Sequence, residues 1–93
     1  MSRSAFRSRS SIPTELALGY VERIVQNGSR VWFTGEDGAA WCAREELVAE
    51  VPGARAPRCL FFESANAFRR VWLYPAEWLT CTRERLLELS QGR

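Results

Sequence analysis

Residues 59–74 read CLFFESANAFRRVWLY, and this stretch predicts the β-hairpin on which the fold depends. Residues 59–63 form the first strand, 64–67 the turn and 68–74 the second strand. Aromatic and β-branched side chains favour the pleated surface of a sheet, whereas serine and asparagine favour turns. The second strand ends at Tyr74, because the following proline cannot donate a backbone hydrogen bond to the sheet.

The two faces of this hairpin differ in chemistry. With Ala65-Asn66 as a two-residue turn, alternate residues of the two strands share a face. One face carries only apolar side chains: Leu60, Phe62, Val71 and Leu73. The other carries rings with a Glu63–Arg70 diagonal: Cys59, Phe61, Glu63, Phe68, Arg70 and Trp72. The first set predicts a core face. The second is core if a helix covers it, and a contact surface if the helices lie on the opposite side.

Residues 31–44 predict another hairpin, with a turn at residues 35–38. A two-residue turn would pair Thr34 with Trp41, whereas a three-residue loop would pair Phe33 with Trp41. Both registers bring aromatic side chains into contact across the strands. The sequence therefore predicts the hairpin and leaves its register open.

Residues 13–28 are compatible with two structures. Apolar side chains recur four residues apart, which predicts a helix with Thr14 as its N-cap and Asn27-Gly28 as its exit. Alternatively, residues 20–25 form a strand and Asn27-Gly28 forms a type I′ turn into the next strand. We expect the helix, and the strand is the alternative.

Shorter elements follow the hairpins. Residues 45–50 predict one helical turn, and residues 51–54 predict a type II turn because proline precedes glycine at its centre. After Pro75, residues 76–79 predict a helical turn, and Thr80 or Thr82 then caps a final helix to about residue 90. Four leucines of this region are expected to pack inward: Leu79, Leu86, Leu87 and Leu89.

Together these elements predict an α+β fold, an antiparallel sheet of about four strands with an N-terminal and a C-terminal helix. Residues 13–93 are expected to form one small globular domain. Residues 1–12 alternate serine with arginine and predict a disordered arm, since they contain too few apolar side chains to offset the entropy of ordering.

The composition argues against catalysis. The chain of 93 residues has thirteen arginines, no lysine and no histidine, so the commonest general base and the lysine nucleophile are both missing. Glu63 and Glu77 could face each other as a carboxylate pair, but such acids are more often solvated or paired with arginine. Cys81, beside a predicted helix start, is the best candidate for a reactive thiol. We predict a noncatalytic protein without a cofactor.

Cys42, Cys59 and Cys81 are distant from one another in the sequence. Structural zinc sites usually bring their ligands in close pairs, so no metal site is expected. The sequence shows no apolar stretch long enough to cross a membrane, and no apolar segment follows the first arginines, so no secretory leader is expected. Free thiols and a cytoplasmic location are therefore expected.

The C-terminal half resembles small bacterial proteins to which no activity is attached. The resemblance covers residues 51–90 and rests on VPGAR, RCLFFES, RRVW and the YPxxW element at 74–78. It implies a fold, and it implies no chemistry.

The ring-bearing face of the 59–74 hairpin is the predicted binding surface. Phe61, Phe68 and Trp72 would anchor a protein partner or a second copy of the chain, and Arg70 would give direction. The alternative partner is a nucleic acid, whose bases would stack on the same rings. Arg3, Arg7 and Arg9 of the arm would then contact phosphates or another acidic partner, although three charges give only weak affinity.

Overall fold

The computed structural model describes residues 12–48, 52–53 and 57–91. Five strands form one antiparallel sheet in which each strand pairs with the next along the chain. The strands are β1 (Ile24–Gln26), β2 (Arg30–Thr34), β3 (Ala40–Leu47), β4 (Arg58–Glu63) and β5 (Phe68–Val71). The helices are α2 (Thr14–Leu18), the 3₁₀ helix η1 (Trp78–Thr80) and α3 (Arg83–Ser90). The predicted α+β fold is confirmed, with one strand more than expected.

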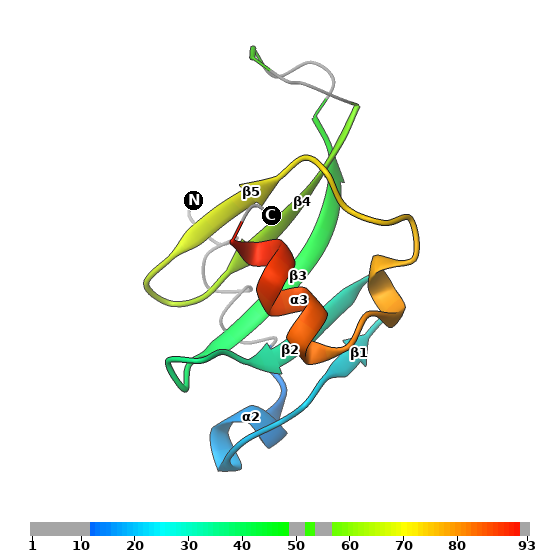
Figure 1. Ribbon diagram of the computed structural model, residues 1–93. Helices are drawn as coiled ribbons and strands as arrows, with labels where there is room; N and C mark the ends of the chain where they lie inside the picture. The colour runs from blue at the N-terminus through cyan, green and yellow to red at the C-terminus, as the bar shows by residue number, and fades with distance from the viewer. Residues whose placement is uncertain (1–11, 49–51, 54–56, 92–93) are drawn as a thin grey trace, which may run out of the picture.

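One face of the sheet, here called the α3 face, is covered by α3 and η1 (Figure 1). Trp78 of η1 and Leu86 and Leu89 of α3 pack there against side chains from four strands. The sheet contributes Val31, Phe33, Trp41, Ala43, Leu60, Phe62 and Val71 to this core. The helix α2 has no buried residue and lies below β1 and β2 in Figure 1. The main core thus lies on one side of the sheet.

The β4–β5 hairpin has the predicted register. Glu63 pairs with Phe68, and the Ser64 amide donates to the Ala67 carbonyl at 2.9 Å across the two-residue turn. The strand β5 nevertheless ends at Val71, three residues earlier than expected. The prediction that Leu73 belongs to the core is wrong, because its side chain lies beyond the strand and is 86% exposed.

The β2–β3 hairpin uses the three-residue loop, and Phe33 pairs with Trp41. The Gly35 amide donates to the Ala39 carbonyl at 2.9 Å, which closes the loop. Gly38 has a φ of 83°, the left-handed conformation that the last residue of such a loop requires.

The N-terminal segment corrects the expectation of one long helix. The helix α2 contains only residues 14–18, and Pro13 rather than Thr14 occupies its N-cap. The chain then returns as β1, and Asn27 and Gly28 have φ values of 55° and 67°, as a type I′ turn requires. The alternative strand is therefore observed, because the apolar residues of this segment gain more from pairing β1 with β2 than from an isolated short helix.

Two shorter predictions have different outcomes. A helical turn at residues 45–50 is wrong for residues 45–47, which continue β3 and pair with β4, while residues 49–50 lie outside the described part. The turn after it is described only at Pro52 and Gly53, and Gly53 has the positive φ of 84° that a type II turn requires.

The C-terminal segment follows the sequence closely. The Trp78 amide donates to the Pro75 carbonyl and starts η1, two residues later than expected. Thr82 is the N-cap of α3, and its side chain accepts a hydrogen bond from the Arg85 amide at 3.2 Å. Leu86 and Leu89 are fully buried, whereas Leu79 and Leu87 are partly buried at the margin of the core.

Candidate functional site

The face of the sheet opposite the α3 face carries arginines, acids and rings in two ordered rows, and we call it the mixed face. The strand registers place Ile24, Trp32, Cys42, Glu63 and Phe68 in one row across the five strands. The neighbouring row holds Gln26, Arg30, Arg44, Phe61 and Arg70. Directly paired residues of antiparallel strands lie on the same side of the sheet, so these side chains are neighbours. The sequence alone did not show this arrangement.

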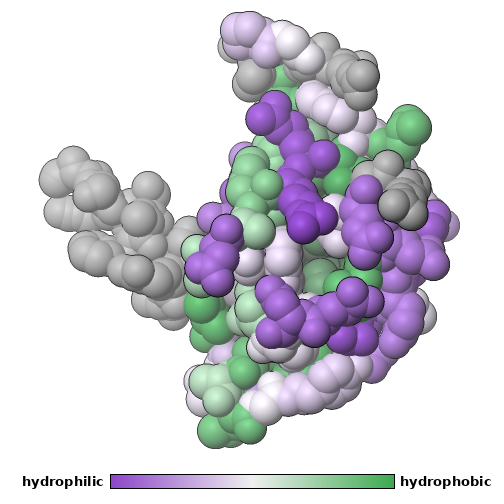
Figure 2. Space-filling model, turned by 60° about the vertical axis from the view of Figure 1, so that its left-hand side comes forward, coloured by the Kyte–Doolittle hydropathy of each residue, from purple (hydrophilic) through white to green (hydrophobic). Residues whose placement is uncertain are grey.

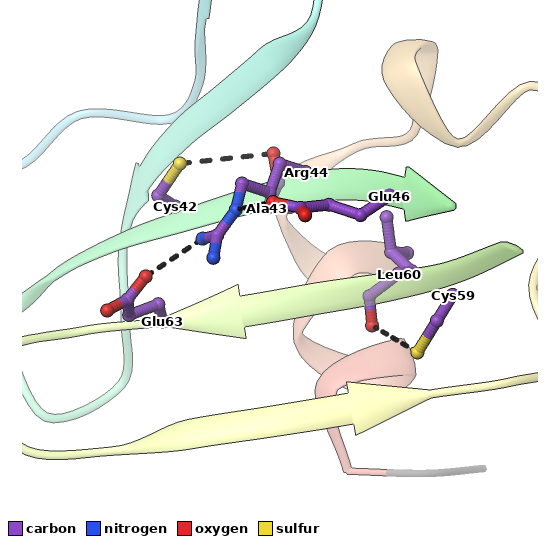
Figure 3. Close-up of polar contacts among 7 residues, drawn as sticks. All are labelled: Cys42, Ala43, Arg44, Glu46, Cys59, Leu60 and Glu63. Carbon is purple, nitrogen blue, oxygen red and sulfur yellow. Dashed lines mark hydrogen bonds and ion pairs between the residues drawn. The ribbon is translucent and has the colours of Figure 1, made fainter. Parts of the chain in front are cut away.

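Arg44 is the electrostatic centre of the mixed face. Its guanidinium lies 2.8 Å from Glu63 on β4 and 2.7 Å from Glu46 on its own strand (Figure 3). Partial burial alone would lower the pKa of Arg44, but the hydrogen bonds to both carboxylates outweigh burial and raise it. Arg44 is therefore a fixed cation whose charge two acids balance. The sequence suggested a diagonal contact between Glu63 and Arg70, but in the structure Glu63 forms its ion pair with Arg44.

The predicted anchors Phe61, Phe68 and Trp72 lie together, but they differ in exposure. Phe61 is only 9% exposed and belongs to a small buried cluster with Val48 and Cys59, against which Trp72 packs. This cluster contains no residue from the described helices. Phe68 packs its ring against Phe61 and keeps 51% of its surface exposed. Phe61 therefore lies beneath the surface, and Phe68 and the half-buried Trp72 supply the rings that a partner could contact.

The two arginines of the RRVW stretch serve different faces. Arg69 points to the α3 face, where its guanidinium lies over the Trp41 ring and donates to the Ser90 carbonyl at 3.4 Å. Arg70 is exposed on the mixed face. Within the described residues, neither Arg70 nor Arg30 in the same row has a carboxylate partner. Three strand spacings separate these two cations, or about 14 Å.

A groove of about 580 Å³ runs along the mixed face over β2 and β3. Its lining includes Trp32, Arg30, Cys42 and Ile12. Trp32 is only 5% exposed, and its indole nitrogen donates to Gln26 at 3.1 Å. Ile12, the first of the described residues, belongs to this lining. The predicted contacts Arg3, Arg7 and Arg9 lie outside the described residues.

Comparison with protein-family models, with curated proteins and with solved structures finds no match to this chain.

The residues considered for chemistry are not brought together. Glu63 lies on the mixed face with Arg44, whereas Glu77 precedes η1, which packs on the α3 face. Burial raises the pKa of Cys42 to about 11, and the nearby Arg30 and Arg44 offset this only in part. Cys81 is half-buried at the end of η1. In the described part of the chain, no group of three or more potential ligand side chains could hold a metal ion.

Among the residues that the structure describes, no helix is long and apolar enough to cross a membrane. The hairpin that carries Phe68 lies at the left edge of the molecule in Figure 1, and Figure 2 brings this side forward. Hydrophilic and hydrophobic side chains are interspersed on this side of the molecule.

Sequence reasoning missed Arg30 and Arg44 as members of the site. The signal was present, because both residues alternate with the core residues Val31 and Ala43 and must face the other way. What was missing was the β2–β3 register, which aligns the two arginines.

Proposed function

We propose that this protein is a small noncatalytic interaction module that binds a protein partner, or a second copy of itself, through the mixed face at β5. The observation that carries the proposal is the exposure of Phe68 and Arg70 beside the half-buried Trp72. Aromatic and arginine side chains held on a rigid scaffold are the usual anchors of protein interfaces. A cytoplasmic location is part of this proposal, and the three free thiols support it.

The support under these anchors favours binding without large rearrangement. Phe68 rests on Phe61, and the Arg44 guanidinium lies over the Phe61 ring at 5.4 Å from its centroid. Ion pairs to Glu46 and Glu63 hold Arg44 in place. A ring that is already ordered loses little side-chain entropy when a partner covers it.

A noncatalytic role is supported by the state of the polar groups. Two acids of the mixed face are engaged with Arg44, and the Cys42 thiol has a pKa far above neutrality. A general acid or base needs a pKa near the operating pH, and a nucleophile needs activation. Binding therefore explains the mixed face better than chemistry does.

Sedimentation velocity from micromolar to millimolar concentration tests this proposal, with Phe68→Ser as the variant and Leu18→Ser as the matched control. Leu18 is 82% exposed on α2, so the control removes exposed apolar surface elsewhere. A self-associating protein becomes larger with concentration, and only Phe68→Ser abolishes this. For a different partner, wild type and Leu18→Ser retain the same protein from a lysate and Phe68→Ser loses it. Equal behaviour of all three proteins contradicts the proposal.

A nucleic acid is the second candidate partner, and the row of arginines favours it. Arg30 and Arg70 lie on one row of the sheet with Phe61 between them, and Ile12 and Arg30 line the same groove. Arg3, Arg7 and Arg9 could add phosphate contacts. Titration of tryptophan fluorescence with oligothymidylate at two salt concentrations tests this candidate. Five phosphate contacts predict a salt slope of about −3.5, and no quenching at low salt rules it out.

A further inference from the structure

The strand β5 lies at one end of the sheet and offers an unpaired edge beside the proposed binding surface. It pairs with β4 on one side, and no other described strand pairs with it. An edge strand presents free backbone N–H and C=O groups that can accept another strand. At the other end of the sheet, β1 has only three residues and is the poorer edge.

Two of the usual protections of an edge strand, proline and a β-bulge, are absent from β5. It contains no proline, and the hairpin register shows no bulge within its four residues. Its two arginines are the only charges, and Arg69 is engaged on the α3 face with Trp41 and Ser90. Arg70 is the one edge charge that points away from the core, and within the described residues it has no carboxylate partner. No described strand covers this edge, and its charge selects what can pair with it.

The same charge disfavours a second copy of β5 as the partner strand. In an antiparallel pair about a twofold axis, opposing residues lie on the same face. The registers centred on β5 would place Arg69 against Arg69 or Arg70 against Arg70. Like charges directly opposite each other are destabilising. A strand that carries carboxylates has the complementary charge.

We propose that β5 binds an extended acidic segment of another protein by strand addition, with a carboxylate of that segment opposite Arg70. Phe68 precedes Arg70 on the mixed face, and Trp72, one residue beyond β5, packs against Phe61 on that face, so the segment would place apolar side chains near these rings. Backbone hydrogen bonds would supply affinity, and alternation of apolar and acidic side chains would supply specificity. This inference rests on the proposed function and names the kind of partner and its mode of binding.

The probe is a short synthetic peptide in which glutamate alternates with valine. Its binding to the full chain is followed by NMR of the Phe68–Val71 amides and by tryptophan fluorescence. A peptide of the same sequence, N-methylated at alternate backbone nitrogens, keeps the charge but cannot pair as a strand. Oligothymidylate provides a polyanion without a peptide backbone. The variants are Arg70→Glu and Arg30→Glu, which change the net charge equally on the same face.

We expect the acidic peptide to bind and to slow amide exchange in β5, and N-methylation to weaken it about tenfold or more. Arg70→Glu should weaken binding about tenfold, and Arg30→Glu less than about threefold. Strand addition is overturned by any of three results. The N-methylated peptide binds as tightly as the unmodified one, Arg70→Glu and Arg30→Glu weaken binding equally, or oligothymidylate binds more tightly than the peptide. If the peptide fails while Phe68-dependent association persists, strand addition is wrong and the proposed function stands.

Discussion

The ring centroids of Phe61 on β4 and Phe68 on the neighbouring strand β5 lie 5.1 Å apart, and the ring planes make an angle of 30°. Arg44 lies over the Phe61 ring from β3, so a cation and two rings form one stack across three strands. The stack begins in an ion-pair network and ends at an exposed ring. This arrangement joins the electrostatic centre of the mixed face to its most accessible apolar surface.

Replacing Gly35 with alanine is expected to destabilise the β2–β3 hairpin. A Cβ atom at this position would overlap the indole ring of Trp41 and force it to shift, and the shift is costly because Trp41 is packed in the core. Overpacking of this kind costs about 1–3 kcal/mol of the free energy of unfolding. Urea denaturation measures the loss, with Glu36→Ala in the same loop as the control. A Gly35→Ala protein as stable as wild type contradicts the observed packing.

Removing the N-cap of α3 should lower stability by about 1 kcal/mol, because the Arg85 amide loses its acceptor in Thr82→Ala. For a domain of this size the loss corresponds to about 4–8 °C in Tm. Thr82→Ser keeps the hydroxyl acceptor and should remain near wild type. Thermal unfolding of the three proteins measures the effect, and equal losses in both variants would exclude the cap as its cause.

Asp37 predicts a specific response to acid. Hydrogen bonds from the Ala39 amide and the Trp41 indole lower the pKa of Asp37 in the folded protein. The stability it contributes is therefore present above the ordinary pKa of aspartate and is lost as the pH falls through the lowered pKa. Asp37→Asn should show a shallower fall in Tm between neutral pH and about pH 2 than wild type. Parallel Tm curves would contradict this role.

The three cysteines should differ in reactivity. Cys42 and Cys59 are buried, and burial raises the pKa of both thiols. Cys81 is partly exposed and should be alkylated first by iodoacetamide at neutral pH. Peptide mapping by mass spectrometry measures the order, and denatured protein should lose the difference. Modification of Cys42 as fast as Cys81 in the folded state contradicts the burial of the Cys42 side chain.

Local signals were sufficient for the C-terminal half of the fold. Alternation fixes the faces of residues 59–71, the two-residue turn fixes their register, and Thr82 marks the start of α3. These features depend on residues close in sequence. The early end of β5 was missed, because nothing in the sequence before Pro75 separates a strand from an extended chain.

Long-range pairing decided what the sequence left open. The spacing of the apolar residues before Asn27 slightly favoured a helix over a strand, and pairing with β2 selected the strand. The Phe33–Trp41 pair likewise depends on the loop conformation at Gly38. The candidate site shows the same division. Phe68, Arg70 and Trp72 follow from one hairpin, whereas Arg30 and Arg44 join them only through the register of the whole sheet.

Hydroxyl-radical footprinting tests most directly whether the β5 end of the mixed face is an accessible contact surface. Phe68 and the buried Phe62 are the same residue type on neighbouring strands, so their oxidation rates compare exposure alone. The account predicts that Phe68 of the dilute protein is oxidised several-fold faster than Phe62, and that a bound partner slows Phe68 selectively. Oxidation of Phe68 as slow as that of Phe62 in the dilute, unbound protein would contradict it.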